Sequence, residues 1–415
     1  MNLDLFNPLR EERGVTLIMV ALLILVFIGV AALAIDIGHL FVVRNELQNA
    51  ADAGCLSGAR FLYSYSDDGM VVKMAVNENA NQIAYQAAVA NKSEKAPVEV
   101  LWSGGDVERG HWCFWCFETP TFTPNESPQP VDLWDVSPEE LDANLDFINA
   151  IRVKTRRQKT PVASFFAGIF GYENFSLSTE AIAYIGFAGT LAPGEVDQPI
   201  AICKESLLVD EKYTCTIGRV ISIGTHLPGQ QTGGWTDFTQ DPLGSVPNPL
   251  TVALLVTQNK NPDPIILGLP LAVSGGDMPV AFSLLRDRWE DVTDKDESWR
   301  ITLPVVECPN KTMVGAVTVN IVWITGEVED PAYSDAPWVM EDPRDQTTWS
   351  SNDPDGQVRW NSFVQNFNLQ KMDGSSAPYQ EKVVYFLPDC NYHKPAGRTG
   401  GENFGVLAKI PVLAK

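Results

Sequence analysis

Two cysteines separated by two aromatic residues form the motif of this 415-residue sequence with the clearest chemical potential, Cys113-Phe-Trp-Cys116. In thiol oxidoreductases such a pair opens a helix, whose positive end lowers the pKa of the first thiol. Here the pair follows Gly110-His-Trp, and the aromatic surroundings indicate a strand. That context favours a structural disulfide or two buried thiols over redox catalysis. A metal site with His111 is a third interpretation, but zinc needs a fourth ligand and no second paired motif supplies one.

The chain has seven cysteines, which fits an oxidising compartment because disulfides persist outside the cytosol. Cys203 and Cys215 stand on two strand-like runs that close a short loop, so we expect them to pair. Cys308 and Cys390 then form a second pair by elimination. The odd count leaves at least one cysteine unpaired or intermolecular.

Two acidic segments, residues 350–356 and 291–297, have the oxygen density of calcium loops. The first departs from the EF-hand template because Ser362 stands where the bidentate Glu is required, so we expect acidic surface turns. The sequence contains no P-loop, no G-x-G-x-x-G, no G-x-S-x-G and no H-E-x-x-H. We therefore predict a protein that is not an enzyme and binds no cofactor.

The charge balance bears on partners. The chain carries 52 acidic and 30 basic residues, a net charge of −22. Nucleic-acid binding depends on clustered Lys and Arg, so we expect no nucleic-acid partner. The content of hydrophobic residues is 45%, with 11 Trp and 19 Phe, which suffices for packed cores and argues against disorder.

The most prominent element of the chain begins with residues 15–35, an uncharged run in which only Thr16 is polar. About 20 apolar residues in a helix cross the hydrocarbon core of a bilayer, so we predict a single-pass membrane helix. Arg10 and Arg13 precede the run and Arg44 follows it, which places the N-terminus in the cytoplasm and the bulk of the chain outside. The run exceeds the roughly 7 to 15 residues of a signal-peptide core, so we expect an uncleaved anchor.

One helix face continues beyond the apolar run. Apolar and small residues recur there at three- and four-residue steps: Leu40, Val43, Leu47, Ala51, Gly54 and Gly58. Small residues allow another helix to approach closely. The pattern predicts one long helix over residues 15–62, with its first half in lipid and its second half packed against protein.

The same stretch resembles the N-terminal domain of TadG-like Flp (tight adherence) pilus-assembly proteins. The residues that carry the resemblance are Arg13, Gly14, Asp36, Gly38, Leu47, Gln48, Asn49, Ala50, Ala51, Asp52, Ala53, Gly58 and Ala59. Gly54 and Cys55 depart from it, since the family usually has Ala at both places. The resemblance implies a bacterial inner-membrane protein that contacts other pilus-assembly or pilin-like proteins, and a partner for Asp36 in that assembly. His39, one turn away, is a second candidate partner of Asp36.

Residues Gly14-Val-Thr-Leu-Ile18 also resemble the cleavage region of type IV prepilins. Cleavage after Gly14 would release a 14-residue leader and leave the helix as an assembly stalk. At the position of Met19 pilins carry a Glu, whose charge neutralises a neighbouring N-terminus in the filament. Met19 has no such charge, which argues against a core subunit of a pilus filament. An intact Met1 in N-terminal sequencing would eliminate the processed form.

We expect an α+β fold in four segments: 1–14, a cytoplasmic N-terminus or leader; 15–62, the long helix with its transmembrane part at 15–35; 63–188, an α+β domain with a small antiparallel sheet; and 189–415, a mostly-β domain. In the α+β domain we predict helices over 70–91, 139–147 and 162–170 and strands over 150–156 and 175–185. Ser137 and Glu140 form the capping box of the middle helix. In the last domain we predict strands at 200–203, 213–217, 265–269, 299–306, 314–324, 382–387 and 405–413, one helix over 280–292 and a surface excursion over 327–374. The run over 314–324 consists mostly of β-forming residues, so we expect it to be a central strand.

These features predict a membrane-anchored structural component of Flp/Tad-type pilus assembly, with the lipid bilayer and other assembly proteins as partners. The alternative is a processed minor pilin or a surface adhesin carried on the filament. A third hypothesis is an envelope thiol oxidoreductase that uses Cys113 and Cys116.

Overall fold

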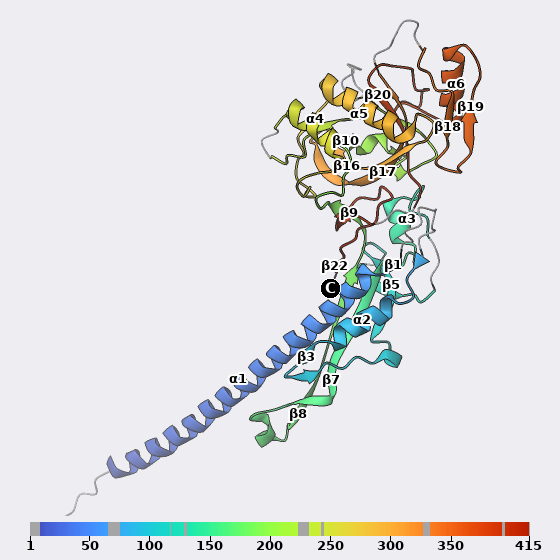
Figure 1. Ribbon diagram of the computed structural model, residues 1–415. Coiled ribbons are helices and arrows are strands. Elements are labelled where there is room, and N and C mark those ends of the chain that lie inside the picture. Colours follow the sequence, from blue (N-terminus) through green and yellow to red (C-terminus); the bar gives the residue numbers. More distant parts are fainter. Residues whose placement is uncertain are drawn as a thin grey trace, which may run out of the picture.

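The computed structural model describes residues 9–64, 75–116, 118–127, 131–222, 232–241, 245–326, 333–391 and 395–414. It has an α+β fold, as predicted from the sequence. A long helix leads into a first domain with a small antiparallel sheet, and a larger β-rich second domain lies beyond it (Figure 1).

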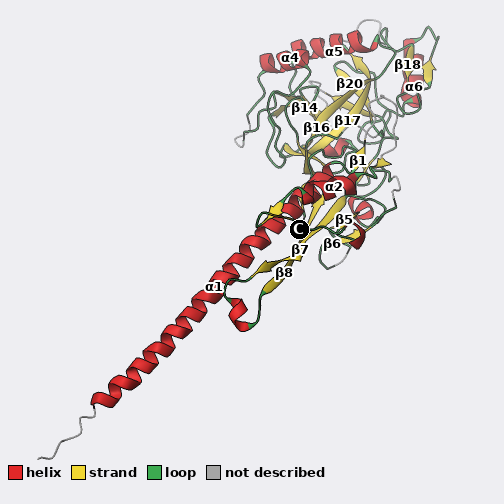
Figure 2. Ribbon diagram, turned by 60° about the horizontal axis from the view of Figure 1, so that its bottom comes forward, coloured by secondary structure: helices red, strands yellow, loops and turns green. Residues whose placement is uncertain are grey.

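Helix α1 (Leu9–Arg60) is 52 residues long, about 78 Å at 1.5 Å per residue. No proline interrupts it. The N-terminal half projects away from both domains, and the C-terminal half lies along the first domain (Figures 1 and 2). The prediction of one continuous helix is confirmed.

The first domain is built on an antiparallel five-stranded sheet in the order β22-β8-β7-β5-β6. Its strands are β5 (Val107–Cys113), β6 (Thr121–Pro124), β7 (Ala150–Ala163), β8 (Asn174–Tyr184) and β22 (Val412–Leu413). Strand β22 comes from the end of the chain and pairs with β8. The last residues of the predicted 189–415 segment therefore add to the sheet of the first domain.

Two helices cover one face of this sheet. The C-terminal half of α1 packs on β7 and β8, helix α2 (Ala80–Val89) packs on α1, β5 and β7, and their apolar residues form one continuous core. Helix α3 (Pro138–Asp142) begins with the predicted capping box, because the Ser137 side chain accepts the Glu140 N–H and the Glu140 carboxylate accepts the Ser137 N–H.

The second domain contains a seven-stranded mixed sheet in the order β13-β20-β17-β16-β10-β14-β15. Its strands are β10 (Ile200–Cys203), β13 (Arg219–Ser222), β14 (Gly233–Thr236), β15 (Val273–Ser274), β16 (Trp299–Glu307), β17 (Thr312–Thr325) and β20 (Val383–Pro388). Strand β17 lies between β16 and β20, which confirms the predicted central strand, and β10 is parallel to β16.

Helices α4 (Pro249–Gln258), α5 (Pro279–Thr293) and α6 (Gly356–Asn366) surround this sheet. Short elements complete the fold: β1 (Tyr63–Ser64), β2 (Ala75–Val76), β3 (Lys92–Ser93), β4 (Ala96–Pro97), β9 (Phe187–Thr190), β11 (Leu208–Val209), β12 (Lys212–Tyr213), β18 (Val339–Glu341), β19 (Thr348–Ser350), β21 (Arg398–Gly401), and the 3-10 turns η1 (Trp102–Gly104), η2 (Ala167–Phe170) and η3 (Lys204–Ser206).

Several predicted elements differ from the structure. The compact helix predicted over 162–170 is wrong: β7 continues to Ala163, because Val162 and Ala163 pair with β8, and only the short turn η2 follows. The excursion predicted over 327–374 is also wrong in its described part, since Trp360 and Phe363 of α6 are buried in the core of the second domain. The helix predicted over 70–91 is shorter, with 70–74 outside the described residues. The strand predicted over 265–269 is an isolated bridge at Ile265.

Candidate functional site

The free half of α1 has the surface of a membrane-spanning helix. Large apolar side chains over residues 15–35 are exposed, from Val20 at 48% to Leu17 at 74%. Among the described residues this is the one helix long and apolar enough to cross a membrane, with a mean hydropathy of 3.2 in its most apolar window. The length and composition of this helix agree with the membrane span expected from the sequence.

The family-like residues after the apolar run divide into a packed face and an exposed face. Leu47, Ala50, Ala51 and Ala59 are fully buried in the core of the first domain. Gly58 lies so close to α2 and β7 that an added Cβ would come within 2.7 Å of Ala84 Cβ.

Other family-like residues are exposed or only half-buried, although Gln48 also donates to the Glu180 carbonyl of β8 at 3.3 Å. Gly38 and Asn49 are exposed, and a Cβ at Gly38 would meet nothing within 4 Å. Gln48 donates to Asp52 at 2.9 Å, and Ala53 is half-buried. Arg13 and Gly14 lie in the helix, and the structure describes nothing of their side chains.

Asp36, the first residue after the apolar run, holds the tip of the β7–β8 hairpin. Its carboxylate is buried and accepts N–H groups from Phe165 at 2.7 Å, Phe166 at 3.0 Å and Ala167 at 2.6 Å. His39, predicted as a partner of Asp36, hydrogen-bonds to the Glu94 carboxylate instead. Asp36 thus fixes a loop more than 120 residues away to the helix where it leaves the apolar run.

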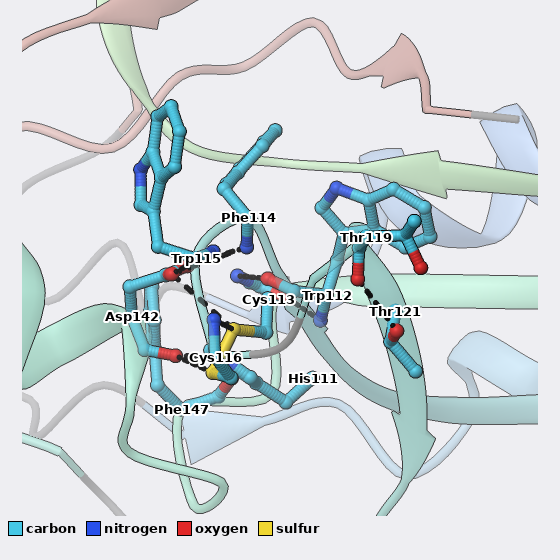
Figure 3. Close-up of a disulfide and its surroundings, with 11 residues drawn as sticks. His111, Trp112, Cys113, Phe114, Trp115, Cys116, Thr119, Thr121, Asp142 and Phe147 are labelled. Carbon is cyan, nitrogen blue, oxygen red and sulfur yellow. Dashed lines mark hydrogen bonds between the residues drawn. A yellow bond between two sulfur atoms is a disulfide. The ribbon is translucent and has the colours of Figure 1, made fainter.

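Cys113 and Cys116 form a disulfide, which agrees with the structural interpretation of the motif (Figure 3). The carboxylate of Asp142 at the end of α3 accepts the N–H groups of Phe114 at 2.9 Å and Trp115 at 2.7 Å, so α3 holds this CFWC loop (residues 113–116) in place. His111 is fully buried, and its Nδ1 and Nε2 lie 2.6 Å and 2.7 Å from the carbonyl oxygens of Phe147 and Asp142. The ring nitrogens that a metal would need are engaged by the backbone.

The other cysteine pairing differs from the prediction. Cys203 pairs with Cys308 and Cys215 with Cys390, so the expected pairs 203–215 and 308–390 are wrong. The reason is sheet topology: β10 runs parallel to β16, and the register sets Cys203 opposite Val306, two residues before Cys308. Cys55 is the free cysteine and is buried.

An apolar cleft separates the CFWC loop from the second domain. It has a volume of about 270 Å³, and Phe114, Trp115 and Tyr184 line it from one side while Tyr213 and Phe404 line it from the other. Trp115 is 82% exposed at its mouth. The domains are joined beside it by the ion pair between Lys212 and Glu140, at 2.7 Å. Lys212 and the Ser137 N–H hold the pKa of Glu140 below its ordinary value.

The acidic segments suspected of binding calcium have structural roles in the fold. Asp355 caps α6, since its side chain accepts the Gln357 N–H at 2.8 Å. Asp294 is the left-handed C-cap residue of α5. Residues 351–355 form the loop before α6, as expected, whereas the segment 291–297 begins inside α5 and becomes a turn only after Thr293.

The sequence analysis missed the hairpin tip. Residues 160–172 contain no charged side chain, and they place Phe-Phe and Ile-Phe on either side of Ala-Gly. Phe165, Ile169, Phe170 and Tyr172 are all more than 60% exposed in the structure. An uncharged, aromatic-rich segment between charged neighbours was the available signal, but it resembles a short apolar helix in the sequence.

Comparison with known families covers the helix and the first domain. Residues 14–60 match the family described as Flp pilus-assembly TadE/G-like, and residues 58–183 match the family described as Tad-like Flp pilus-assembly. No curated protein and no solved structure matches the chain. The two family matches overlap at residues 58–60, the end of α1, so together they extend from the apolar helix into strand β8. Together the two matches cover residues 14–183, which include the long apolar helix and the packed motif that follows it, and they support the resemblance of this part of the chain to TadG-like Flp pilus-assembly proteins; the second domain lies outside both matches.

Proposed function

We propose that this protein is a structural, non-enzymatic component of Flp/Tad-type pilus assembly, anchored in the bacterial inner membrane by residues 15–35 of α1. The bulk of the chain lies on the periplasmic side and acts through contacts with other pilus-assembly or pilin-like proteins. The observation that carries the proposal is the division of α1 into an exposed apolar half and a half buried in the first domain. Because the same continuous helix is the membrane anchor and part of the core of the first domain, no flexible linker separates the first domain from the membrane.

The disulfides support an oxidising compartment for the body. Six of the seven cysteines are paired, and the two long-range pairs link β10 to the segment after β16 and the segment after β12 to the end of β20. Disulfides of this kind are rare in the cytosol. Their distribution over both domains is in keeping with a periplasmic or extracellular body.

The proposal is tested in the producing bacterium by deleting the gene and then restoring it with the wild-type chain or with a chain whose residues 15–35 are replaced by a cleavable secretory signal. We expect loss of pili in the deletion strain, recovery with the wild-type chain and no recovery with the released body. Normal piliation in the deletion strain would contradict the proposal.

The alternative of a processed minor pilin or adhesin is separated by fractionation. An anchored assembly component remains in the membrane with an intact N-terminus when filaments are sheared from the cells. A pilin-like subunit appears in the sheared filaments and begins at Val15.

A further inference from the structure

The tip of the β7–β8 hairpin presents apolar side chains that the fold does not use. Over residues 165–172 the exposed fractions reach 65% for Phe165, 80% for Ile169, 70% for Phe170 and 63% for Tyr172. Outside α1, no other stretch of eight residues in the described parts of the chain exposes as many large apolar side chains. Such a patch on a folded protein marks a contact with a partner or a membrane.

The tip is an ordered structure. Ser164 donates its N–H to the Glu173 carbonyl at 3.0 Å and its hydroxyl to the Tyr172 carbonyl at 2.7 Å, and Tyr172 donates back to Ala167 at 3.1 Å. The exposed aromatic rings are therefore presented by a closed, hydrogen-bonded turn.

The level of the tip along α1 is set by Asp36 and His39. The Asp36 carboxylate binds three consecutive backbone N–H groups of the tip, and the His39 ring packs on the Phe165 ring with their centroids 4.7 Å apart. Asp36 directly follows the 21 residues 15–35, which span about 32 Å as a helix and match a hydrocarbon core of about 30 Å. Ala32, one turn before Asp36 and inside that span, is already buried. The hairpin end lies beside α1 (Figure 2), at the level where the proposed membrane-spanning run ends.

We propose that this tip, residues 164–172, is a second membrane contact, which inserts its aromatic side chains into the headgroup region of the outer leaflet beside α1. The inference rests on the proposed membrane anchor. A Tyr ring at this depth matches the aromatic belt of membrane proteins, and Phe side chains are typical of the apolar face of segments that lie in the membrane interface. The absence of charge over residues 160–172 removes the desolvation cost that a charged tip would have. Two attachment points, helix and hairpin, fix the tilt of the body relative to the membrane.

The test uses the full-length chain, with its disulfides intact, in vesicles of phosphatidylethanolamine and phosphatidylglycerol. Cys55→Ala removes the free thiol, and Gly168→Cys provides a labelling site at the tip, where a Cβ would meet only the Ser164 hydroxyl at 3.6 Å. Asn352→Cys, on an exposed residue of the second domain, is the matched control. Each chain carries an environment-sensitive fluorophore, and flotation of the vesicles reports anchoring separately.

We expect the tip label to be quenched by lipids carrying a nitroxide near the headgroup and to be shielded from iodide in water, whereas the control label shows the reverse. Ile169→Ser with Phe170→Ser, both exposed, should abolish the lipid quenching while flotation persists. A chain that floats with a tip label as accessible to iodide as the control overturns the membrane contact and leaves the anchor intact. A tip label shielded from both quenchers also overturns it, because protein would then cover the tip. A chain that does not float overturns the anchor itself.

Discussion

Gly58→Val tests the claim that the C-terminal half of α1 is part of the core of the first domain. A Cβ at Gly58 would lie 2.7 Å from Ala84 Cβ and 2.7 Å from Ile151 Cδ1. Carbon atoms in contact are normally about 3.5–4.0 Å apart, so α2 and β7 must both move. Overpacking of this kind costs about 1–3 kcal/mol, and the better helix propensity of valine recovers only about 0.3 kcal/mol. The expected net loss is about 2 kcal/mol.

The chain contains its own reporter for this change. Cys55 is a free thiol, fully buried one turn from Gly58, while the other six cysteines are in disulfides. Its reaction with a thiol reagent without reductant measures how often α1 opens from the domain. A loss of about 2 kcal/mol should raise the labelling rate roughly 30-fold.

Gly38→Val is the matched control, since the same substitution on the same helix meets nothing within 4 Å of the added Cβ. We expect Cys55 in this variant to react at the wild-type rate. Equal rates for Gly58→Val and wild type would refute the packing of α1 against α2 and β7. Equal acceleration by both substitutions would show that the effect does not depend on the contacts at Gly58.

Three further predictions follow from the described contacts. Asp36→Asn should accelerate hydrogen exchange of the backbone amides of residues 165–167 roughly tenfold or more, because an amide cannot accept three N–H groups as a carboxylate does; unchanged exchange would contradict the role of Asp36. Replacing both Cys215 and Cys390 by Ala should lower the free energy of unfolding of the second domain by about 5 kcal/mol in denaturant titrations, since the disulfide closes a loop of 175 residues; loss of only about 2 kcal/mol, the value for a loop as short as the CFWC loop, would argue against this pairing. Burial raises the pKa of Asp197, so its stabilising contribution is complete below the ordinary carboxyl pKa and is lost as the pH rises through the raised value; Asp197→Asn should therefore raise the melting temperature at pH 7, with the gain over wild type disappearing toward pH 4, and a gain that is independent of pH would contradict the assignment.

Patterns within short stretches of the sequence predicted several elements of the fold. The uncharged run and the small-residue face predicted α1, and Ser137 with Glu140 predicted the start of α3. The run over 314–324 predicted a central strand because it consists mostly of β-forming residues. In each case the signal lies within the element itself, although α1 and β17 pack against distant segments.

Contacts between distant segments were not predictable in this way. Cys203 pairs with Cys308, 105 residues away, because β10 and β16 are neighbours in the sheet, and nothing near either cysteine encodes that neighbour. The role of Asp36 also depends on a distant segment, the hairpin tip. The segment 162–170 was predicted as a helix. Its first two residues instead extend β7 by pairing with Phe175 and Asn174, which lie on the far side of the turn.

Protease accessibility of both ends of the full-length chain tests the topology most directly. A chain with one epitope before residue 9 and another after residue 415 is expressed in the producing bacterium, and spheroplasts are treated with protease before and after the membrane is broken. We predict that the C-terminal epitope is digested in intact spheroplasts, that the N-terminal epitope survives until the membrane is broken, and that the chain remains in the membrane at alkaline pH. A C-terminal epitope protected in intact spheroplasts, or a chain released without detergent, would contradict the anchored periplasmic body.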